Sequence, residues 1–411
     1  MYTELNRGLT DEQKLLKQSM HEFAREVMRP ASISLDKMTP EETIAEGSPM
    51  WDVFRRAYEQ GIHVRNFPEA LGGAALGPIE SHIVNEEFGW GSAGLAIALA
   101  VCSFPFAFAA GRRDPQMMEE IVNPFLEDRQ GKYIGCWAIT EPGHGSDTLM
   151  PGTKYFNDDK IFYGLQATLD GDEYVLNGQK SAWVSNGTIA THALAFLGVE
   201  RSMGMAGGGV AIVPLNLPGV SKGAPLNKIG QRALNQGEIF FDNVRIPKTY
   251  MLVPPQAYVG AIDAVLAGAN AYMGSTFTGV ARAAFEEGLT YARDRVQGGV
   301  PITEHQLVQK KIFDMFVKVE TARQMSRATV LYNQGANPPG TLYSITSKVY
   351  CTQAAFEVAS DAVQLHGGMG LTKEMPIEMI FRDARASMIE DGSNDILSLT
   401  AAKRIIDTYA V

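Results

Sequence analysis

The chain has 411 residues, 45% apolar and 20% charged, which is enough material for two or three packed domains. Its 36 basic and 46 acidic residues give a net charge of −10 without a basic tract, which excludes the positive face that nucleic-acid binding needs. Three cysteines are too few for a disulfide framework, and the first residues lack the apolar stretch of a secretory signal. We therefore expect a reducing, cytoplasmic location.

The first third of the sequence predicts helices. Thr10 with Gln13 three residues later is the pattern of a capping box, and apolar residues follow it at helical spacing. Further helices are expected around 49–60, 77–90, 93–110 and 115–128. The uncharged run 93–111 approaches a membrane span in length, but Pro105 interrupts it. We expect this run to be a buried helix that lines a cavity.

From about residue 132 to Pro247, short apolar runs are bounded by turn residues, which predicts a β domain. Asn177 and Gly178 stand between two such runs and predict a hairpin turn. Helical patterns do not alternate with these strands, which argues against a parallel doubly wound sheet.

Long helical patterns return after about residue 255. Thr303 is expected to cap one of these helices, and further helices fit 342–365 and 393–409. The predicted fold is mainly α with a middle β domain. We place the domain boundaries at 1–131, 132–249 and 250–411.

The common catalytic patterns are absent from the sequence: the GxxxxGK[ST] phosphate loop, the HExxH zinc motif, the GxSxG nucleophile elbow and the GxGxxG dinucleotide fingerprint. The seven histidines show no metal-ligand spacing, so no metal site is predicted. A flavin or nicotinamide would have to be held in another way.

Three stretches are unusual, and each has a structural and a functional interpretation. The glycine-rich segment 135–147 could present backbone N–H groups to a ligand or could be an ordinary loop. The acids of 389–395 could complement the last helix dipole while Ser393 caps that helix, or Asp391 could be aimed into a cavity. Arg295, near the end of a helix, could bind a ligand or could complement the helix dipole.

Taken together and in order, these stretches resemble the acyl-CoA dehydrogenase family of FAD-dependent flavoproteins. The resemblance rests on TEPGHGSD, NGQKSAWVSNG, KIGQRALNQGEIFFDNVRIP, YARDRVQGGVPITEHQLVQKK and AVQLHGGMGLTKEMPIEMIFRDARASMIEDGSNDI. It implies a helical N-terminal domain, a small β-barrel or sandwich domain and a C-terminal four-helix bundle. It also implies an acyl-CoA substrate, an electron-transfer flavoprotein as partner, and a homotetramer without a membrane span.

The resemblance also implies which residues form the sites. Around the flavin ring and the pantetheine it places Trp137, Ile139, Thr140, Ser146, Trp183 and Ser185. On the adenosine and pyrophosphate of FAD it places Arg295 and Gln306 of a neighbouring subunit together with Gln364, Gly367 and Gly368. On the substrate side it places Ser146, Asn270 and Gly392.

The family's catalytic base is a Glu just before a glycine near the last helix, and here that position is Asp391, with Glu390 as the alternative. Asp is one methylene shorter than Glu, and misplacing a base by about 1 Å costs roughly a hundredfold in rate. The family's two arginines near the base read Asn270 and Ser398, and an aromatic residue of the flavin segment reads Gly298. These departures favour an atypical acyl group over a straight-chain one, and the small and aromatic residues of 93–111 suggest a compact or cyclic group.

The aromatic residues Phe104, Phe106 and Phe108 could enclose such a group. The expected activity is α,β-dehydrogenation of an acyl-CoA thioester, with proton transfer to Asp391 and hydride transfer to FAD. Two alternatives remain at this point: a flavin oxidase on the same scaffold, and a non-catalytic partner subunit of a hetero-oligomer.

Overall fold

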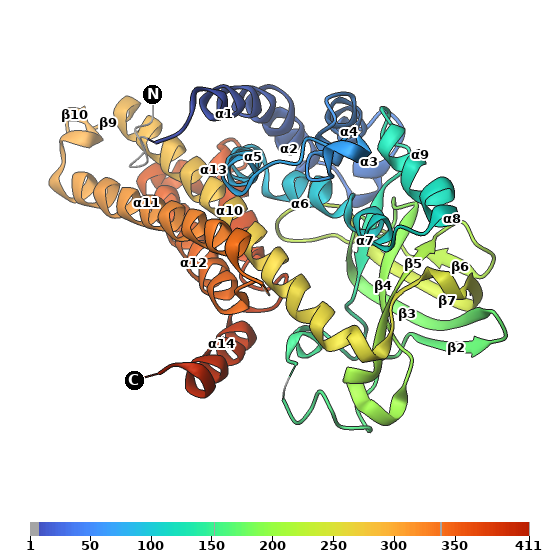
Figure 1. Cartoon of the computed structure of the whole chain (residues 1–411). Helices are drawn as coiled ribbons and strands as arrows, with labels where there is room; N and C mark the ends of the chain where they lie inside the picture. Colours follow the sequence, from blue (N-terminus) through green and yellow to red (C-terminus); the bar gives the residue numbers. More distant parts are fainter. Residues whose placement is uncertain (1–7, 152, 338, 411) are drawn as a thin grey trace.

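The computed structural model describes residues 8–151, 153–337 and 339–410 (Figure 1). Its N-terminal part consists of helices and short 3₁₀ or π turns: α1 (Asp11–Phe23), η1 (Ala24–Met28), α2 (Arg29–Leu35), α3 (Pro40–Ile44), α4 (Pro49–Glu59), η2 (Ile62–Val64), η3 (Glu69–Leu71), α5 (Pro78–Gly91), α6 (Ala93–Val101), α7 (Phe104–Arg112), α8 (Pro115–Met117), η4 (Met118–Val122) and α9 (Asn123–Glu127). The capping box is confirmed, because Thr10 Oγ1 accepts from Gln13 N at 3.2 Å and Gln13 Oε1 accepts from Thr10 N at 3.0 Å.

The single helix expected over 93–110 is wrong in one respect, because the chain breaks into α6 and α7 at Cys102 and Ser103. Pro105 stands in the first turn of α7, where its missing N–H and its fixed φ are tolerated. By length and composition the segment Ala93–Arg112 could cross a membrane, but 72% of its most apolar window is buried inside the fold. All residues of α6 are buried, as expected for a core helix.

Eight described strands form one sheet in the order β6-β7-β3-β1-β4-β5-β8, with β2 pairing β3 and β4. Their bounds are β1 (Gly135–Ala138), β2 (Gln166–Asp170), β3 (Glu173–Ser185), β4 (His192–Gly198), β5 (Gly208–Pro214), β6 (Val220–Lys222), β7 (Gln236–Pro247) and β8 (Met251–Val253), with 3₁₀ turns η5 (Ser146–Leu149), η6 (Arg201–Gly207) and η7 (Lys248–Tyr250). β1 runs parallel to β4 and antiparallel to β3, and Trp137 lies opposite Ser185 in that second pair.

The predicted hairpin turn at Asn177 and Gly178 is wrong. β3 continues through both residues, and the pairing of β3 with β7 shifts register there, as in a β-bulge. Gly178 has φ +133°, and a Cβ at this position would lie 2.5 Å from the carbonyl oxygen of Gly164. The glycine is therefore required by a bulge and a close backbone approach, and the β2–β3 turn falls at Gly171 instead.

The C-terminal part is again helical: α10 (Pro255–Asp294), α11 (Gln306–Gly335), α12 (Thr341–His366), α13 (Pro376–Ala386) and α14 (Asn394–Thr408), with a short hairpin of β9 (Val296–Gln297) and β10 (Val300–Pro301) and 3₁₀ turns η8 (Ile302–Glu304) and η9 (Gly367–Leu371). α10, α11 and α12 pack side by side, and α13 packs on α10 and α12 (Figure 1). The predicted Thr303 cap is wrong, because Thr303 lies in η8 and α11 begins at Gln306.

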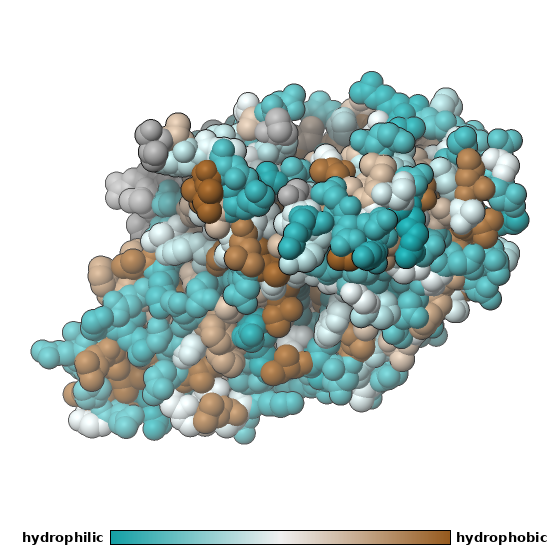
Figure 2. Space-filling model, turned by 90° about the horizontal axis from the view of Figure 1, so that it is seen from below, coloured by the Kyte–Doolittle hydropathy of each residue, from teal (hydrophilic) through white to brown (hydrophobic). Residues whose placement is uncertain are grey.

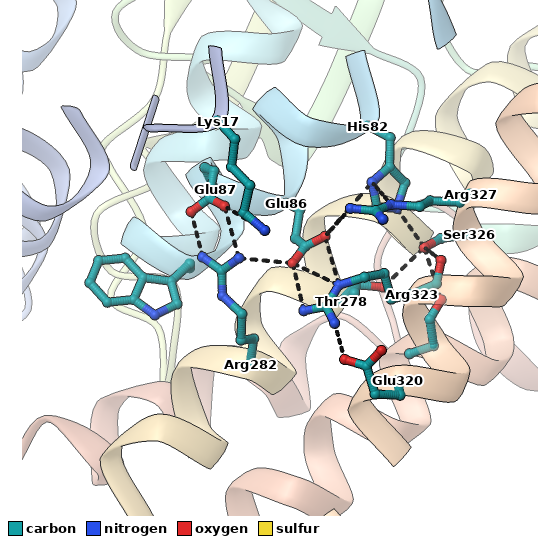
Figure 3. Close-up of polar contacts among 12 residues, drawn as sticks. Lys17, His82, Glu86, Glu87, Thr278, Arg282, Glu320, Arg323, Ser326 and Arg327 are labelled. Atoms are coloured by element: carbon teal, nitrogen blue, oxygen red, sulfur yellow. Dashed lines mark hydrogen bonds and ion pairs between the residues drawn. The ribbon is translucent and has the colours of Figure 1, made fainter. Parts of the chain in front are cut away.

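A buried network of ion pairs joins the N-terminal helix α5 to α10 and α11 (Figure 3). Glu86 Oε1 lies 2.9 Å from Arg282 Nη1 and 2.9 Å from Arg323 Nη2, and Glu87 pairs with Arg282 through both carboxylate oxygens. Burial raises the pKa of Glu86, but Arg323 and Arg282 outweigh it and hold the pKa well below its usual value. Glu86 is therefore charged at neutral pH and links three helices.

Replacing Glu86 by Gln is expected to destabilise the protein by about 3–5 kcal/mol, because removing one partner of a buried ion pair leaves its arginines uncompensated. Thermal and urea denaturation measure this. A matched control is Glu59→Gln, which removes the exposed partner of Arg55 and is expected to cost about 0–1 kcal/mol. Equal effects of the two substitutions would contradict a central role for the network.

Candidate active site

The segment that carries Asp391 connects α13 to α14 and contains two successive residues in the left-handed backbone region. Asp391 has φ +53° and Gly392 has φ +93°. Left-handed backbone is uncommon for non-glycine residues, although Asp tolerates it better than most. At Gly392 a Cβ would lie 2.9 Å from Leu397 Cδ2, so only glycine fits without a shift. Ser393 then caps α14 by accepting from Ile396 N, as the sequence predicted.

Two other elements hold this segment, which we call the base loop (Ser387–Ser393). The backbone N–H of Ser393 donates to Ser146 Oγ at 3.0 Å, so the glycine-rich segment of the β domain and the base loop meet. From α12, Lys348 Nζ donates to the carbonyl oxygen of Gly392 at 2.8 Å. The structure thus brings together two stretches that are about 245 residues apart in the sequence and that sequence analysis singled out separately.

Asp391 is half-buried, and no described residue donates a hydrogen bond to its carboxylate. Burial raises its pKa to about 6, against the opposing charge of Lys348. A carboxyl group with this pKa is mostly ionised at neutral pH yet can hold a proton. These are the properties that a general base needs.

Glu390, the alternative base, is engaged elsewhere. Its Oε1 accepts from Gln231 Nε2 at 2.5 Å, across the boundary with the β domain. Burial, together with the charge of the neighbouring Asp391, raises its pKa to about 7. The hydrogen bond directs this carboxylate toward the β6–β7 loop, so the geometry favours Asp391 over Glu390.

Sequence analysis missed Tyr272 and Lys348. Tyr272, on α10, donates its hydroxyl to the carbonyl of Ala96 on α6 at 2.7 Å. Burial raises its pKa to about 12, and the charges of Asp391 and Glu390 contribute to this rise. Tyr272 is therefore bound to the apolar helix α6 and lies within range of the charges of the base loop. No sequence signal marks it.

Lys348 could have been found, because it lies on the buried face of a helix with small residues at helical spacing, namely Ser344, Ser347, Cys351 and Thr352. A lysine on such a stripe is a buried charge that needs a partner.

The residues expected near the flavin ring lie on or beside neighbouring strands of the sheet. Trp137 is buried on β1, and its Nε1 has no hydrogen-bond partner among the described residues. Trp183 on β3 is 56% exposed, which is unusual for a tryptophan. Ser185 Oγ accepts from Gln236 Nε2 at 3.3 Å, while Ile139 is buried and Thr140 half-buried just after β1.

The residues expected on the FAD adenosine and pyrophosphate gather at the other end of the chain. Tyr291 near the end of α10 stacks on His366 at the end of α12, with ring centroids 4.2 Å apart, so Arg295 and the Gly367–Gly368 turn share one end of the bundle. Arg295, Gln306 and Gln364 are exposed there. Figure 1 places the β9–β10 hairpin and the sheet at opposite ends of the molecule.

Neither of the positions that replace the family's expected arginines supplies a charge to the base loop. Asn270 is fully buried on α10, where its Nδ2 donates to Leu266 O at 2.9 Å within the same helix. Ser398 is exposed on α14. Lys348 of α12 is a cation that sequence analysis did not identify, and its charge acts on Asp391 against the effect of burial.

Comparisons with known proteins agree with this geometry. Family models of the N-terminal, middle and C-terminal domains of acyl-CoA dehydrogenases match residues 10–109, 136–244 and 261–406. The chain is 30% identical over 405 residues to the mitochondrial short-chain specific acyl-CoA dehydrogenase of Bos taurus, covering 98% of this chain and 92% of the relative. It is 28% identical over 412 residues to the cyclohexane-1-carbonyl-CoA dehydrogenase of Geobacter metallireducens, covering 98% and 99%.

Among solved structures, butyryl-CoA dehydrogenase from Megasphaera elsdenii has the same fold, with a TM-score of 0.85 and 24% identity, covering 98% of this chain and 100% of that chain. The chain belongs to the acyl-CoA dehydrogenase family. It is an oxidoreductase that acts on CH–CH bonds, and members of this family are FAD-dependent flavoproteins.

The side chains of the chain fit FAD. The orphaned indole N–H of Trp137 and the exposed ring of Trp183 suit a planar heteroaromatic group with acceptor atoms. At the other end, Arg295 offers a bidentate donor for a diphosphate, and Gly367 and Gly368 have open space where a Cβ would stand. These two groups of residues are the ones that would hold the ring and the diphosphate.

The Asp391 carboxyl group is expected to be protonated below about pH 6 and ionised above it, because burial raises its pKa from 3.8 to about 6. Difference infrared spectra of protein with isotope-labelled aspartate measure this titration. The band should vanish in Asp391→Asn and persist in Asp395→Asn, which changes an exposed neighbour. A band at position 391 that is fully ionised by pH 4.5 would contradict the assigned burial.

Proposed function

We propose that this protein dehydrogenates the Cα–Cβ bond of an acyl-CoA thioester, with Asp391 as the base that removes the α-proton. The observation that carries the proposal is the Asp391 carboxylate. It is half-buried, its pKa is near 6, and it is held by the base loop against the glycine-rich segment through Ser146. Glu390 is bound to Gln231 and is the weaker candidate.

The chain's own groups account for the proton. At neutral pH the ionised Asp391 accepts the α-proton and becomes the carboxylic acid. The backbone N–H of Asp391 donates to no acceptor among the described residues, so it is available to the thioester carbonyl oxygen. A donor at that oxygen stabilises the negative charge that develops as the proton leaves. When bound, FAD supplies the acceptor that takes the β-hydrogen with its electron pair, which leaves the α,β-unsaturated thioester as product.

We propose that the acyl group is compact or cyclic. Tyr272 donates its hydroxyl to the carbonyl of Ala96 on α6, and Phe104 packs against Trp137 with ring centroids 5.9 Å apart. Phe106 stacks on Phe125 in the N-terminal core, so of these two rings only Phe104 reaches the flavin-side tryptophan. The similarity to the cyclohexane-1-carbonyl-CoA dehydrogenase supports the same substrate class.

We also propose that the protein is a homotetramer. α10 has 40 residues and is about 60 Å long at 1.5 Å per residue, so Arg295 at its end lies far from the strands that α10 contacts near its start. This separation supports an arrangement in which Arg295 serves the FAD of a second copy. We propose an electron-transfer flavoprotein as the electron acceptor. We also propose that the protein is cytoplasmic.

Exposed apolar side chains are consistent with such an assembly. The C-terminal helices and turns expose Leu307, Phe313, Val317, Leu331, Tyr332, Leu371, Leu399, Ile405, Ile406 and Tyr409. Figure 2 shows brown hydrophobic groups between hydrophilic ones on the face seen from below. Exposed apolar residues in this number on packed helices are typical of subunit interfaces.

Replacing Asp391 by Asn is expected to leave FAD content unchanged and to slow flavin bleaching by at least about a thousandfold, because an amide cannot accept the proton. The measurement is anaerobic mixing of the yellow protein with cyclohexane-1-carbonyl-CoA or butyryl-CoA, followed by flavin absorbance. Asp395→Asn and Glu390→Gln are controls that should bleach within about tenfold of the parent. Bleaching that survives in Asp391→Asn but is lost in Glu390→Gln would assign the base to Glu390. Slow reoxidation of the bleached protein by air separates a dehydrogenase from an oxidase.

A panel of CoA thioesters tests the proposed acyl group. Ring-shaped and short branched acyl groups are expected to give the highest kcat/KM, because we propose that Tyr272, which is bound to α6, limits the depth of the site. Highest kcat/KM on long straight chains would overturn the compact-substrate proposal and would leave the dehydrogenase reaction intact.

A further inference from the structure

Lys348 occupies an unusual place for a lysine. It is the eighth of the 26 residues of α12, and none of its side chain is exposed to solvent. Its Nζ donates to the carbonyl oxygen of Gly392 at 2.8 Å and to Asn394 Oδ1 at 2.8 Å. Asn394 returns to the same helix by donating from Nδ2 to Thr352 Oγ1 at 3.1 Å. α12 is thus hydrogen-bonded to Gly392, the residue after Asp391, and to Asn394, the first residue of α14.

We propose that Lys348 is a positioning residue for Asp391: its ammonium group fixes the carbonyl of Gly392 and the start of α14, and so sets where the Asp391 carboxylate stands. The inference rests on the proposed function and names a residue through which that site is built. It assigns Lys348 no contact with substrate or cofactor.

The backbone conformation of the base loop explains why it needs hydrogen bonds from other elements. Asp391 and Gly392 both adopt left-handed φ, and for Asp391 this conformation is intrinsically unfavourable. Strained backbone persists only where its surroundings hold it. The loop has the Ser146 hydroxyl on one side and Lys348 on the other, and Lys348 bonds directly to the carbonyl of the strained turn.

The charge of Lys348 matters as well as its hydrogen bonds. A neutral donor could have satisfied the Gly392 carbonyl without the cost of burying an ammonium group. Burial lowers the pKa of Lys348 to about 8, and the charges that oppose this are those of Asp391 and Glu390. Glu390 also faces Lys228, from the β6–β7 loop. For Asp391, Lys348 is the charge that acts against the effect of burial.

This arrangement replaces the cations that the resemblance led us to expect. Asn270 uses its amide within α10, and Ser398 faces solvent. With an Asp in place of a Glu, the carboxylate also reaches less far from the loop. A base with a shorter side chain depends more strongly on the position of its backbone, and Lys348 controls that position through Gly392.

The test uses the FAD-loaded protein with Lys348→Met, Lys348→Gln and Lys348→Arg. The Met variant removes charge and donors at similar length, the Gln variant keeps a donor without charge, and the Arg variant keeps the charge. Lys318→Met is the matched control. It removes a lysine of α11 whose Nζ lies 2.8 Å from Glu357 Oε2 on α12, remote from the base loop. If Lys348→Met does not fold, Lys348→Gln carries the comparison.

The first readout does not depend on activity. Infrared titration of Asp391 is expected to move from about pH 6 to higher pH in Lys348→Met and Lys348→Gln, because the cation that favours the carboxylate is gone. It should stay near pH 6 in Lys348→Arg and Lys318→Met. An unchanged titration in both uncharged variants would overturn the electrostatic part of the inference.

The second readout is anaerobic flavin bleaching by cyclohexane-1-carbonyl-CoA and butyryl-CoA. Lys348→Met is expected to slow it roughly 10- to 100-fold at saturating thioester, with little change in the half-saturating concentration, because the base is displaced while the binding groups remain. The rising limb of the pH–rate profile should move to higher pH with the titration. In an Asp391→Asn background, Lys348→Met should add little further loss.

The outcomes separate the two hypotheses. If neither thioester bleaches the parent protein, the proposed function fails for this substrate class, while the infrared titration still judges Lys348. If the parent bleaches and Lys348→Met does so at the same rate and with the same pH profile, the inference about Lys348 fails and the proposed function stands. Full additivity of Lys348→Met with Asp391→Asn would also overturn it, because Lys348 would then act by another route.

Discussion

The left-handed turn at Asp391 and Gly392 is the constraint on which the candidate site depends. A carboxylate on a regular helix would point along a direction set by the helix, but two left-handed residues in succession turn it out of the path between α13 and α14. Such a turn is held from outside by Ser146 of the β domain and Lys348 of α12. The middle domain and the C-terminal bundle therefore have to be docked before the base has a defined position.

The two acids of the base loop show how neighbouring carboxyl groups acquire different roles. Glu390 is bound by Gln231 and faces the β6–β7 loop, whereas the Asp391 carboxylate receives no hydrogen bond from the described residues. Burial raises the pKa of both groups, and their proximity makes ionisation of the second costlier once the first is charged. Hydrogen bonding, more than acidity, distinguishes Glu390 from Asp391, the acid that we propose as the base.

The sequence predicted the fold well where the signals were local. The capping residues Thr10 and Ser393 are confirmed, as is the order of helical, β and helical parts. The hairpin predicted from Asn177 and Gly178 is wrong because glycine is also favoured at bulges and where two backbones approach closely. Only the folded structure shows that the backbone of Gly164 packs against Gly178.

Only those site residues that lie in recognisable sequence motifs could be predicted. Asp391, Ser146 and the Gly367–Gly368 turn stand in recognisable stretches, and the roles assigned to them remain predictions. Lys348 and Tyr272 lie inside helices, where a side chain's importance comes from what packs against it and not from its neighbours in the sequence. The two arginines of the family are absent, as the sequence showed, but an element elsewhere in the chain supplies a charge to the loop, namely Lys348.

The charge network around Glu86 has a consequence for how this protein can diverge. Each arginine there is compensated by a shared carboxylate, so a single replacement leaves an unbalanced ion in the interior, whereas an apolar set of similar volume could fill the same space. Sequences in which only one of these residues is replaced are thus less stable than the complete charged network or a complete apolar replacement. The positions at the junction of α5, α10 and α11 should change as a block over evolutionary time, or be retained together.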